Sequence, residues 1–273
     1  MKIVIVGLGL IGGSIAKSLK QNTGHQVLGI DRDQDALLDA CSCGAIDGKA
    51  SRDDLKTADL VYLCVYPEGA LEFAKESGPM LKEGCVLTDT CGVKGAVCAG
   101  MEGLGGNYAF VAGHPMAGKE HSGFSASDPS IFVGASYIIA DTGAPDWAVE
   151  RVEGLARAMG FGRVVHTAPQ RHDQLIAFTS QAPHALACGY VMSPRCREHQ
   201  GFSAGSYRDV SRVADINAAL WTRLFLDNRE ALVEELDELE RNLRAIRDAV
   251  AQGDEDRLRR LLQKAGEIKR QVG

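Results

Sequence analysis

The sequence lacks the features that define several large classes of protein. It has no apolar run long enough to span a membrane, and its first residues lead straight into a strand pattern, without the regions of a signal peptide. Its net charge is −6, so the basic excess of nucleic-acid-binding proteins is missing as well. We therefore expect a cytoplasmic protein with no membrane and no nucleic acid among its partners.

The sequence also lacks paired cysteine and histidine spacings. Its eight cysteines are scattered, mostly inside apolar segments, and none forms a Cys-x-x-Cys motif. Such cysteines are reduced packing residues rather than disulfide partners or zinc ligands, so we expect no metal site. With 273 residues, 45% hydrophobic and 24% charged, the chain has an ordinary globular composition and enough length for two domains.

The chain begins with a strand, loop and helix pattern that is typical of nucleotide binding. A β-branched apolar run passes directly into Gly7-Leu-Gly9-Leu-Ile-Gly12 and then into helical spacing. Gly7 permits the turn, Gly9 lets the backbone approach a pyrophosphate, and Gly12 lets the helix lie close to the strand. The N–H groups of the helix start, at Leu10 and Ile11, would then face the anion.

An acidic residue supports this interpretation against a glycine turn without a ligand. The next apolar run, residues 27–30, ends in Asp31, where a carboxylate can accept both ribose hydroxyls of an adenosine. Asp31 also repels a 2′-phosphate, which favours NAD over NADP. Arg32 works against that preference, because a guanidinium could hold such a phosphate. We expect NAD as the cofactor, with NADP less favoured.

Strands and helices alternate through the first part of the chain. Apolar runs at residues 60–65 and 85–89 are separated by helical segments, as in an α/β fold with a doubly wound, Rossmann-type parallel sheet. We expect this dinucleotide-binding domain to cover residues 1–167. Its ligands would lie beyond the carboxyl ends of the strands, next to Val65, the loop of residues 89–94 and the segment from Gly113.

Beyond Pro169 the alternation stops and helical spacing continues, so residues 168–273 should form an all-helical substrate and dimerisation domain. Six apolar residues recur there at heptad-like spacing: Leu232, Leu236, Leu239, Leu243, Ile246 and Val250. They indicate either a helical hairpin within one chain or, as an equally weighted alternative, a homodimer through the C-terminal helices.

Two strand-end segments carry candidates for chemistry. His114, in Gly-His-Pro-Met-Ala-Gly, follows an apolar strand, and a histidine there can take the proton of an alcohol while hydride leaves the same carbon. The alternative for His114 is a structural role beside a turn. Lys94 lies in the neighbouring segment and could hold a substrate or cofactor anion, or it could be a solvated lysine.

The helical part adds further candidates. Pro183 and His184 interrupt an apolar helical pattern, and a proline there kinks the helix and frees a carbonyl. Arg208 and Arg212 lie close together before Trp221, and such a pair suits a substrate carboxylate, or else a surface ion-pair patch.

On these residues the chain resembles the prephenate and arogenate dehydrogenases of tyrosine biosynthesis, over nearly its full length. The resemblance rests on the following motifs: the glycine segment to Ser14, Thr88-Asp89, Val93-Lys94-Gly95, His114 to Gly118 with Glu120, Ser122 and Gly123, Pro183-His184, Arg208-Asp209, Arg212, and Trp221 with residues 225–230. It implies a dimerising helical domain and hydride transfer to NAD with loss of carbon dioxide. It also implies that His114 contacts the 4-hydroxyl and that Arg212 contacts a substrate carboxylate.

Two positions depart from the family's pattern. Cys91-Gly92 stands where similar enzymes carry Gly-Ser, and Gln181 stands where a histidine is often found. With Lys94 and His184, Gly92 and Gln181 are expected to lie at the substrate, so these departures leave open the choice between prephenate and arogenate. A hydroxyacid or imine oxidoreductase and an NAD-sensing module are the competing interpretations. The reductase would need a lysine in residues 170–190, and that segment has none.

Overall fold

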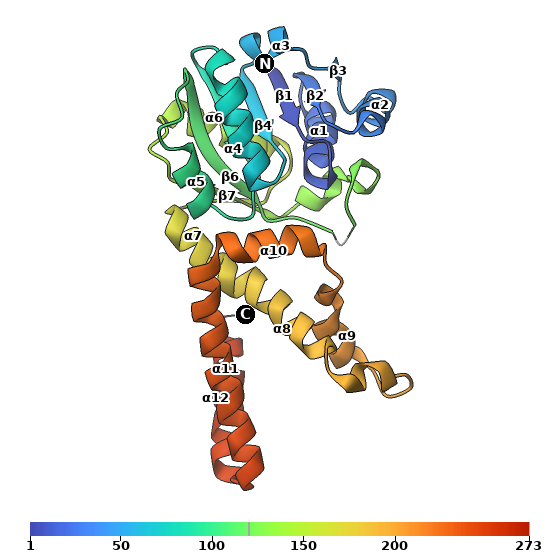
Figure 1. The fold of residues 1–273 in the computed structure, drawn as a ribbon, viewed down its shortest axis with the longest axis vertical. Coiled ribbons are helices and arrows are strands. Elements are labelled where there is room, and N and C mark those ends of the chain that lie inside the picture. Colours follow the sequence, from blue (N-terminus) through green and yellow to red (C-terminus); the bar gives the residue numbers. More distant parts are fainter. Residues whose placement is uncertain (120, 273) are drawn as a thin grey trace.

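The computed structural model describes residues 1–119 and 121–272, so Glu120 of the resemblance lies outside the described residues. Figure 1 shows a sheet-containing unit above and a helical unit below, joined through α7 (Pro169–Ile176). Among the described residues, no helix combines the length and the apolarity that crossing a membrane requires.

The sheet has eight strands in the order β3-β2-β1-β4-β5-β6-β7-β8. Their bounds are β1 Lys2–Val6, β2 Gln26–Ile30, β3 Gly48–Lys49, β4 Leu60–Leu63, β5 Cys85–Asp89, β6 Tyr108–Pro115, β7 Ser136–Ala140 and β8 Arg163–Thr167. Strands β1 to β6 pair in parallel, which confirms the doubly wound sheet expected from the sequence.

One edge of the sheet departs from the parallel arrangement. Strand β7 runs antiparallel to β6, and β8 then runs parallel to β7. The described residues between β6 and β7 form only short 3₁₀ turns, Phe124–Ala126 and Pro129–Phe132. Because a parallel neighbour needs a crossover connection, usually a helix, a chain without one returns in the opposite direction.

Helices cover both faces of the sheet, and each strand divides its side chains between them. On β1, Ile3 and Ile5 join the core under α1 (Leu10–Asn22), α2 (Gln34–Ser42) and α6 (Asp146–Ala158). Val4 and Val6 point to the opposite core, under α3 (Arg52–Thr57), α4 (Pro67–Ser77) and α5 (Gly95–Met101). This period of two makes a strand apolar on both faces.

The helical unit begins with α7, which continues through a π-helical turn, Ala177–Gln181, into α8 (Ala182–Val191). The later helices are α9 (Gly205–Ser211), α10 (Ala218–Asp227), α11 (Arg229–Gln252) and α12 (Glu255–Gln271). Helix α10 lies across the carboxyl ends of the parallel strands (Figure 1). The second unit therefore covers the edge of the sheet where a ligand is expected.

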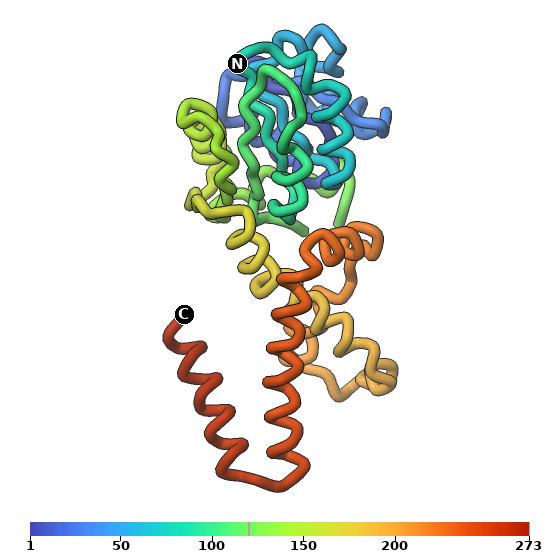
Figure 2. The backbone as a smooth tube through the Cα atoms, turned by 60° about the vertical axis from the view of Figure 1, so that its left-hand side comes forward, coloured from blue at the N-terminus to red at the C-terminus, as the bar shows by residue number. Residues whose placement is uncertain are grey.

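The last two helices form an open hairpin. Gly253 ends α11 in the left-handed conformation, at φ 66°, and the Asp254 side chain accepts a hydrogen bond from the Arg257 N–H at the start of α12. These are the cap roles that a Gly-Asp pair supplies. Figure 2 shows α11 and α12 diverging from this turn, and α12 has no buried residue.

Candidate active site

The glycine loop after β1 has a backbone that requires glycine at two positions. Gly7 has φ 89°, and a Cβ there would lie 2.4 Å from the Cys64 carbonyl oxygen. A Cβ on Gly12 would lie 1.8 Å from the Gly7 carbonyl oxygen. Around Gly9, in contrast, no atom lies within 4 Å of the Cβ position, so its lack of a side chain keeps open space beside the loop. That space fits a bound pyrophosphate.

The start of α1 borders this space. Gly9 precedes the helix and provides no side-chain cap, so the first N–H groups, at Leu10 and Ile11, have no partner from a capping side chain. Both residues are half-buried at the surface of the loop. An uncapped helix start with its positive dipole end is suited to an anion.

Asp31 lies beside the loop, as its place after β2 predicts. Its Oδ2 accepts a hydrogen bond from the Leu8 N–H at 2.5 Å, and its Oδ1 accepts one from the Asp33 N–H at 2.8 Å. Arg32 points away into solvent, with 94% of its side chain exposed, and forms an ion pair with Glu72 of α4 at 3.3 Å. The carboxylate is therefore fixed next to the phosphate cradle, while the guanidinium is held only by a weak surface pair.

Val65 connects the glycine loop to the next strand end. Its Cγ1 atom lies 2.8 Å from the position of a Cβ on Gly7, and its carbonyl oxygen accepts a hydrogen bond from the Cys91 thiol at 3.5 Å. Burial and the nearby Asp89 carboxylate raise the pKa of Cys91 well above its ordinary value. Cys91 is therefore a neutral packing residue between two loops rather than a nucleophile.

Lys94 is not in the environment that the sequence suggested. Its side chain is fully buried and forms an ion pair with the fully buried Asp89, and its Nζ also donates to the Gly113 carbonyl oxygen at 2.7 Å. Asp89 further accepts from the N–H groups of Gly113 and Cys91. The expectation that Lys94 holds a substrate or cofactor anion is therefore wrong for its ammonium group, which is neutralised inside the domain. The pair fixes the ends of β5 and β6 to each other.

His114 lies near the carboxyl end of β6, above this ion pair. It is half-buried, and its Nδ1 lies 2.8 Å from His172 Nε2 of α7. Burial lowers the pKa of His114 well below its ordinary value, and the neighbouring His172 and Lys94 add to that effect. The ring is thus neutral at neutral pH and can accept a proton. On the far side of the ring, Nε2 lies 3.9 Å from the Cβ position of Gly92.

His172 and Asp173 are site residues that sequence reasoning missed. Both are buried, and His172 Nδ1 lies 2.7 Å from Asp173 Oδ1. Asp173 also accepts hydrogen bonds from the N–H groups of Lys94 and Gly95, at 2.8 and 2.7 Å, so it caps α5 from the other domain. The only signal in the sequence was an adjacent His-Asp pair in a polar helical turn, which by itself is typical of a helix surface.

Gln181 belongs to a buried network instead of facing an open pocket. Its amide nitrogen donates to the Leu224 carbonyl oxygen at 3.0 Å, and its amide oxygen accepts from Asn228 at 2.7 Å. Asn228 also donates to the Asp173 carbonyl oxygen at 2.9 Å. Both polar ends of the Gln181 side chain are therefore used inside the helical domain, so the expected substrate contact through this residue is not supported.

His184 packs under α10. Its ring stacks on Trp221 with the ring centroids 3.7 Å apart, and its Nδ1 lies 2.7 Å from the Ser180 carbonyl oxygen. Since a carbonyl oxygen can only accept, Nδ1 of His184 carries the proton of this hydrogen bond. In the neutral ring, Nε2 then carries a lone pair and no proton. The kink expected at Pro183 takes the form of the π-helical turn that ends at Gln181, a device often found at functional sites.

Arg212 begins a 3₁₀ turn, Arg212–Ala214, that packs against α8, the helix of His184. Its side chain is exposed. His184 of α8 stacks on Trp221 of α10, and Leu224 of the same helix lies 3.5 Å from the Cβ position of Gly92. Helix α10 therefore contacts both α8, against which the Arg212 turn packs, and the loop beside His114.

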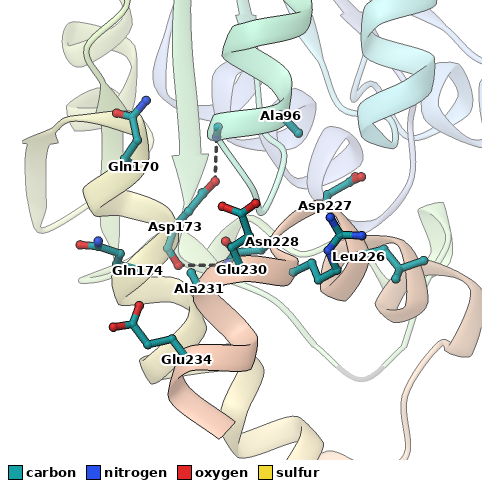
Figure 3. A pocket seen from close by; sticks show the side chains of 12 residues that line it. Ala96, Gln170, Asp173, Gln174, Leu226, Asp227, Asn228, Glu230, Ala231 and Glu234 are labelled. Carbon is teal, nitrogen blue, oxygen red and sulfur yellow. Dashed lines mark hydrogen bonds between the residues drawn. The ribbon is translucent and has the colours of Figure 1, made fainter. Parts of the chain in front are cut away.

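A separate hollow of about 490 Å³ opens on another side of α7. Asp173, Gln174, Asn228 and Glu230 are among its lining residues, and Figure 3 shows Asp173 pointing from this hollow toward the start of α5. None of the residues expected at the site from the sequence lines this hollow.

The chain matches two family models in succession. Residues 15–165 match the nucleotide-binding domain of prephenate dehydrogenase, and residues 168–264 match the prephenate dehydrogenase dimerization domain. The prephenate dehydrogenase of Bacillus subtilis is 32% identical over 96% of this chain and 74% of its own length. The cyclohexadienyl dehydrogenase of Zymomonas mobilis is 31% identical over 94% of this chain and 90% of its own length.

Solved structures agree with the sequence matches. A prephenate dehydrogenase from Aquifex aeolicus, in complex with hydroxyphenyl propionate and NAD⁺, superimposes with a TM-score of 0.89 at 27% identity, over 100% of this chain and 98% of that one. The arogenate dehydrogenase of Synechocystis superimposes with a TM-score of 0.84 at 26% identity, over the whole of both chains.

Proposed function

This chain belongs to the prephenate dehydrogenase family, and on that premise we propose that it catalyses the NAD-dependent oxidative decarboxylation of prephenate to 4-hydroxyphenylpyruvate, a step of tyrosine biosynthesis. The observation that carries the proposal is the position of His114. A neutral imidazole lies near the carboxyl end of β6, and its Nε2 faces the Gly92 position, next to Leu224 of α10 in the helical domain.

The glycine loop and Asp31 would hold the cofactor. The N–H groups at the start of α1 would bind the pyrophosphate, and the Asp31 carboxylate would accept the ribose hydroxyls. The fit rests on the empty space at Gly9 and on the two backbone N–H groups that fix Asp31 in place. When bound, NAD supplies the hydride acceptor.

His114 and Arg212 would act on the substrate. His114 Nε2 would take or share the proton of the 4-hydroxyl, and Arg212 would hold a carboxylate in a two-pronged hydrogen bond. His184 would lie beside them on the stacked Trp221. Since aromatisation makes the reaction steeply downhill, these residues need only align the ring, polarise the hydroxyl and hold the carboxylates.

We also propose a homodimer through the C-terminal helices. Leu243 and Val250 of the heptad-like set are 49% and 61% exposed, and Leu262 and Ile268 of α12 are 56% and 51% exposed. An intrachain hairpin would bury these residues, whereas the open hairpin leaves their surfaces for a second copy. The match to a dimerization domain supports the same conclusion.

Two further proposals concern organisation and compartment. We place the domain boundary between residues 167 and 168, because β8 ends at Thr167 and α7 begins at Pro169. We place the enzyme in the cytoplasm, where its eight free cysteines would stay reduced.

The test is NADH or NADPH production by the purified full-length protein, measured with prephenate and with arogenate, each with NAD and with NADP. We expect turnover with prephenate and NAD. Arogenate is the second candidate, because a whole-chain structural relative is an arogenate dehydrogenase and because Gly92 and Gln181 depart from the family's pattern. Turnover with neither substrate contradicts the proposal and favours a binding module.

A further inference from the structure

A continuous chain of hydrogen bonds crosses from the helical domain to His114. The Asp173 carboxylate lies 2.7 Å from His172 Nδ1, and His172 Nε2 lies 2.8 Å from His114 Nδ1. His172 is 1% exposed and Asp173 is 7% exposed. The His172–Asp173 hydrogen bond is therefore shielded from bulk water, in surroundings where hydrogen bonds are stronger and better fixed in geometry, and His172 is held ready to bond His114.

The direction of each hydrogen bond in this chain follows from donor and acceptor rules. A carboxylate only accepts, so His172 must carry its proton on Nδ1. A neutral His172 then offers a lone pair at Nε2, and His114 must donate to it from Nδ1. The neutral ring of His114 consequently has its lone pair on Nε2.

We propose that His172 and Asp173 are positioning residues that hold His114 in the tautomer with an unprotonated Nε2, ready to accept a proton. Their value for catalysis rests on the proposed function, in which that atom meets the 4-hydroxyl of the substrate. The substrate hydroxyl proton would pass to Nε2 as hydride passes from the carbon that bears the hydroxyl to NAD, and the resulting imidazolium would still donate from Nδ1 to His172.

The surroundings fix Asp173 in this role. Its carboxylate is held by the backbone N–H groups of Lys94 and Gly95, and its carbonyl oxygen by Asn228, as the dashed lines in Figure 3 partly show. The carboxylate therefore cannot turn away from His172 without uncapping α5. Since Lys94 and Gly95 belong to the nucleotide-binding unit, the same contact also sets the distance between the two domains.

On the other side of the ring, Nε2 of His114 faces the backbone of Gly92, which has no side chain. The Cβ position of Gly92 lies 3.9 Å from Nε2, and only Leu224 lies closer to that position, at 3.5 Å. Among the described residues, the charged or titratable groups that act on the ring are His172 and Lys94, and Lys94 forms a buried ion pair with Asp89. With Lys94 and His172 both opposing a positive charge on the ring, the neutral form is favoured.

The first experiment measures the tautomer directly, in the resting full-length protein without substrate. Two-bond ¹H–¹⁵N correlation spectra of protein labelled at its seven histidines distinguish protonated from unprotonated ring nitrogens, and a His114→Gln sample assigns the signal. We expect His114 with a protonated Nδ1 and an unprotonated Nε2 at neutral pH. The reverse tautomer, or a charged ring at that pH, overturns the proposal. The result does not depend on whether prephenate is the substrate.

The second experiment replaces Asp173, the carboxylate that accepts from His172. In Asp173→Asn, the amide nitrogen would take the place of Oδ1 and donate to His172 Nδ1, while the amide oxygen would keep the hydrogen bond from the Gly95 N–H and the one from the Lys94 N–H would be lost. The new donor reverses both hydrogen bonds of the His172 ring and moves the proton of His114 to Nε2. We expect kcat with prephenate to fall by about two to four orders of magnitude, as amide replacement does in the serine protease triad, with the KM for NAD unchanged. The His114 tautomer should change in the same sample.

His172→Gln serves as the second variant, in case Asp173→Asn fails to fold, and kcat should fall with it as well.

The matched control is His166→Gln, which removes another histidine–carboxylate pair, to Glu153 at 2.7 Å, on the exposed edge strand β8. That control should leave kcat and the His114 signal unchanged. Folded Asp173→Asn or His172→Gln protein with kcat within twofold of the parent contradicts the proposal. If the parent protein has no activity with prephenate, the tautomer measurements alone decide it.

Discussion

His114 Nε2 and the Cβ position of Gly92 are 3.9 Å apart, with the Leu224 side chain beside them. This is ordinary van der Waals spacing, so the site has room for a Cβ atom that Gly92 does not supply. The position is the one where similar enzymes carry serine. The serine hydroxyl of similar enzymes is therefore absent here although the Cβ atom of a serine would fit. The change from serine to glycine alters the chemistry of the site and does not follow from a lack of space for that Cβ.

Gly92→Ser should therefore fold normally and place a hydroxyl within reach of His114 Nε2. One added hydrogen bond is worth about 0.5 to 1.5 kcal/mol, so kcat/KM for prephenate should rise by up to about tenfold. Steady-state kinetics with prephenate and arogenate measure the effect. Gly154→Ser, at an exposed position of α6 with no atom within 4 Å of its Cβ, is the matched control. A fall in kcat/KM would mean that the hydroxyl competes with the substrate for Nε2.

His114→Asn should lower turnover by about two to four orders of magnitude, as loss of acid–base help does. NAD should bind as before, because the glycine loop and Asp31 belong to other strand ends. Fluorescence titration with NAD and steady-state rates measured on the same sample separate the two effects. Near-normal turnover would remove the histidine from the mechanism.

Arg212→Ala should act mainly on the substrate. A hydrogen bond to a charged group contributes about 1.5 to 3 kcal/mol, so the KM for prephenate should rise by about ten- to a hundredfold, with a smaller change in kcat. Arg244→Ala, which removes an exposed arginine paired with Glu240 on α11, should have no effect. An unchanged KM in Arg212→Ala would assign the carboxylate contact to another residue.

The lowered pKa of His114 predicts how activity and stability depend on pH. In the folded protein the pKa of His114 lies well below its ordinary value of 6.5, so the ring stays neutral as the pH falls through 6.5. We therefore expect kcat/KM to stay level through that pH and to decline only at lower pH. The unfolded chain binds a proton on this ring at a higher pH than the folded chain does. The stability contributed by the neutral ring is therefore present above 6.5 and lost as the pH falls below it. Rate profiles and urea denaturation at matched pH values measure both, and His114→Gln should reduce the stability loss.

Asp31→Ser should relax the preference for NAD. The serine would no longer repel a 2′-phosphate, and Arg32 could leave its weak pair with Glu72 to bind that group. The ratio of kcat/KM for NADP to that for NAD should rise by about tenfold or more, the effect of a charged hydrogen bond. Asp35→Ser, an exposed acid in the first turn of α2, is the control. A parent enzyme that already prefers NADP would contradict the interpretation of Asp31.

Much of the first domain follows from local sequence patterns. Strand β5 begins and ends at Cys85 and Asp89 as its apolar run predicts, and the glycine loop has the expected backbone. Helix α3, Arg52–Thr57, could not be predicted from periodicity, because six mostly polar residues contain no apolar stripe. Its capping box, formed by Ser51 and Asp54, was the signal available.

The failures at the candidate site have a different cause. A lysine in a polar loop is normally solvated, and only the fold brings Lys94 and Asp89 together in a buried pair. His172 lies 58 residues from His114, so no local pattern relates them. The same holds for Gln181, whose two partners come from α10 and the start of α11. The spacing of motifs cannot predict contacts between segments that are distant in the sequence.

The π-helical turn between α7 and α8 sets which way the side chains of α8 face. A π-turn holds one more residue than an α-turn, so the same residues wound as a regular α-helix would lose their present register. Every later side chain would then rotate by about 100° around the axis, the angular step of one helical residue. His172 would stay against His114, while His184 would leave Trp221. The wide turn, and not only the residues within it, therefore aligns the two histidines with their separate partners.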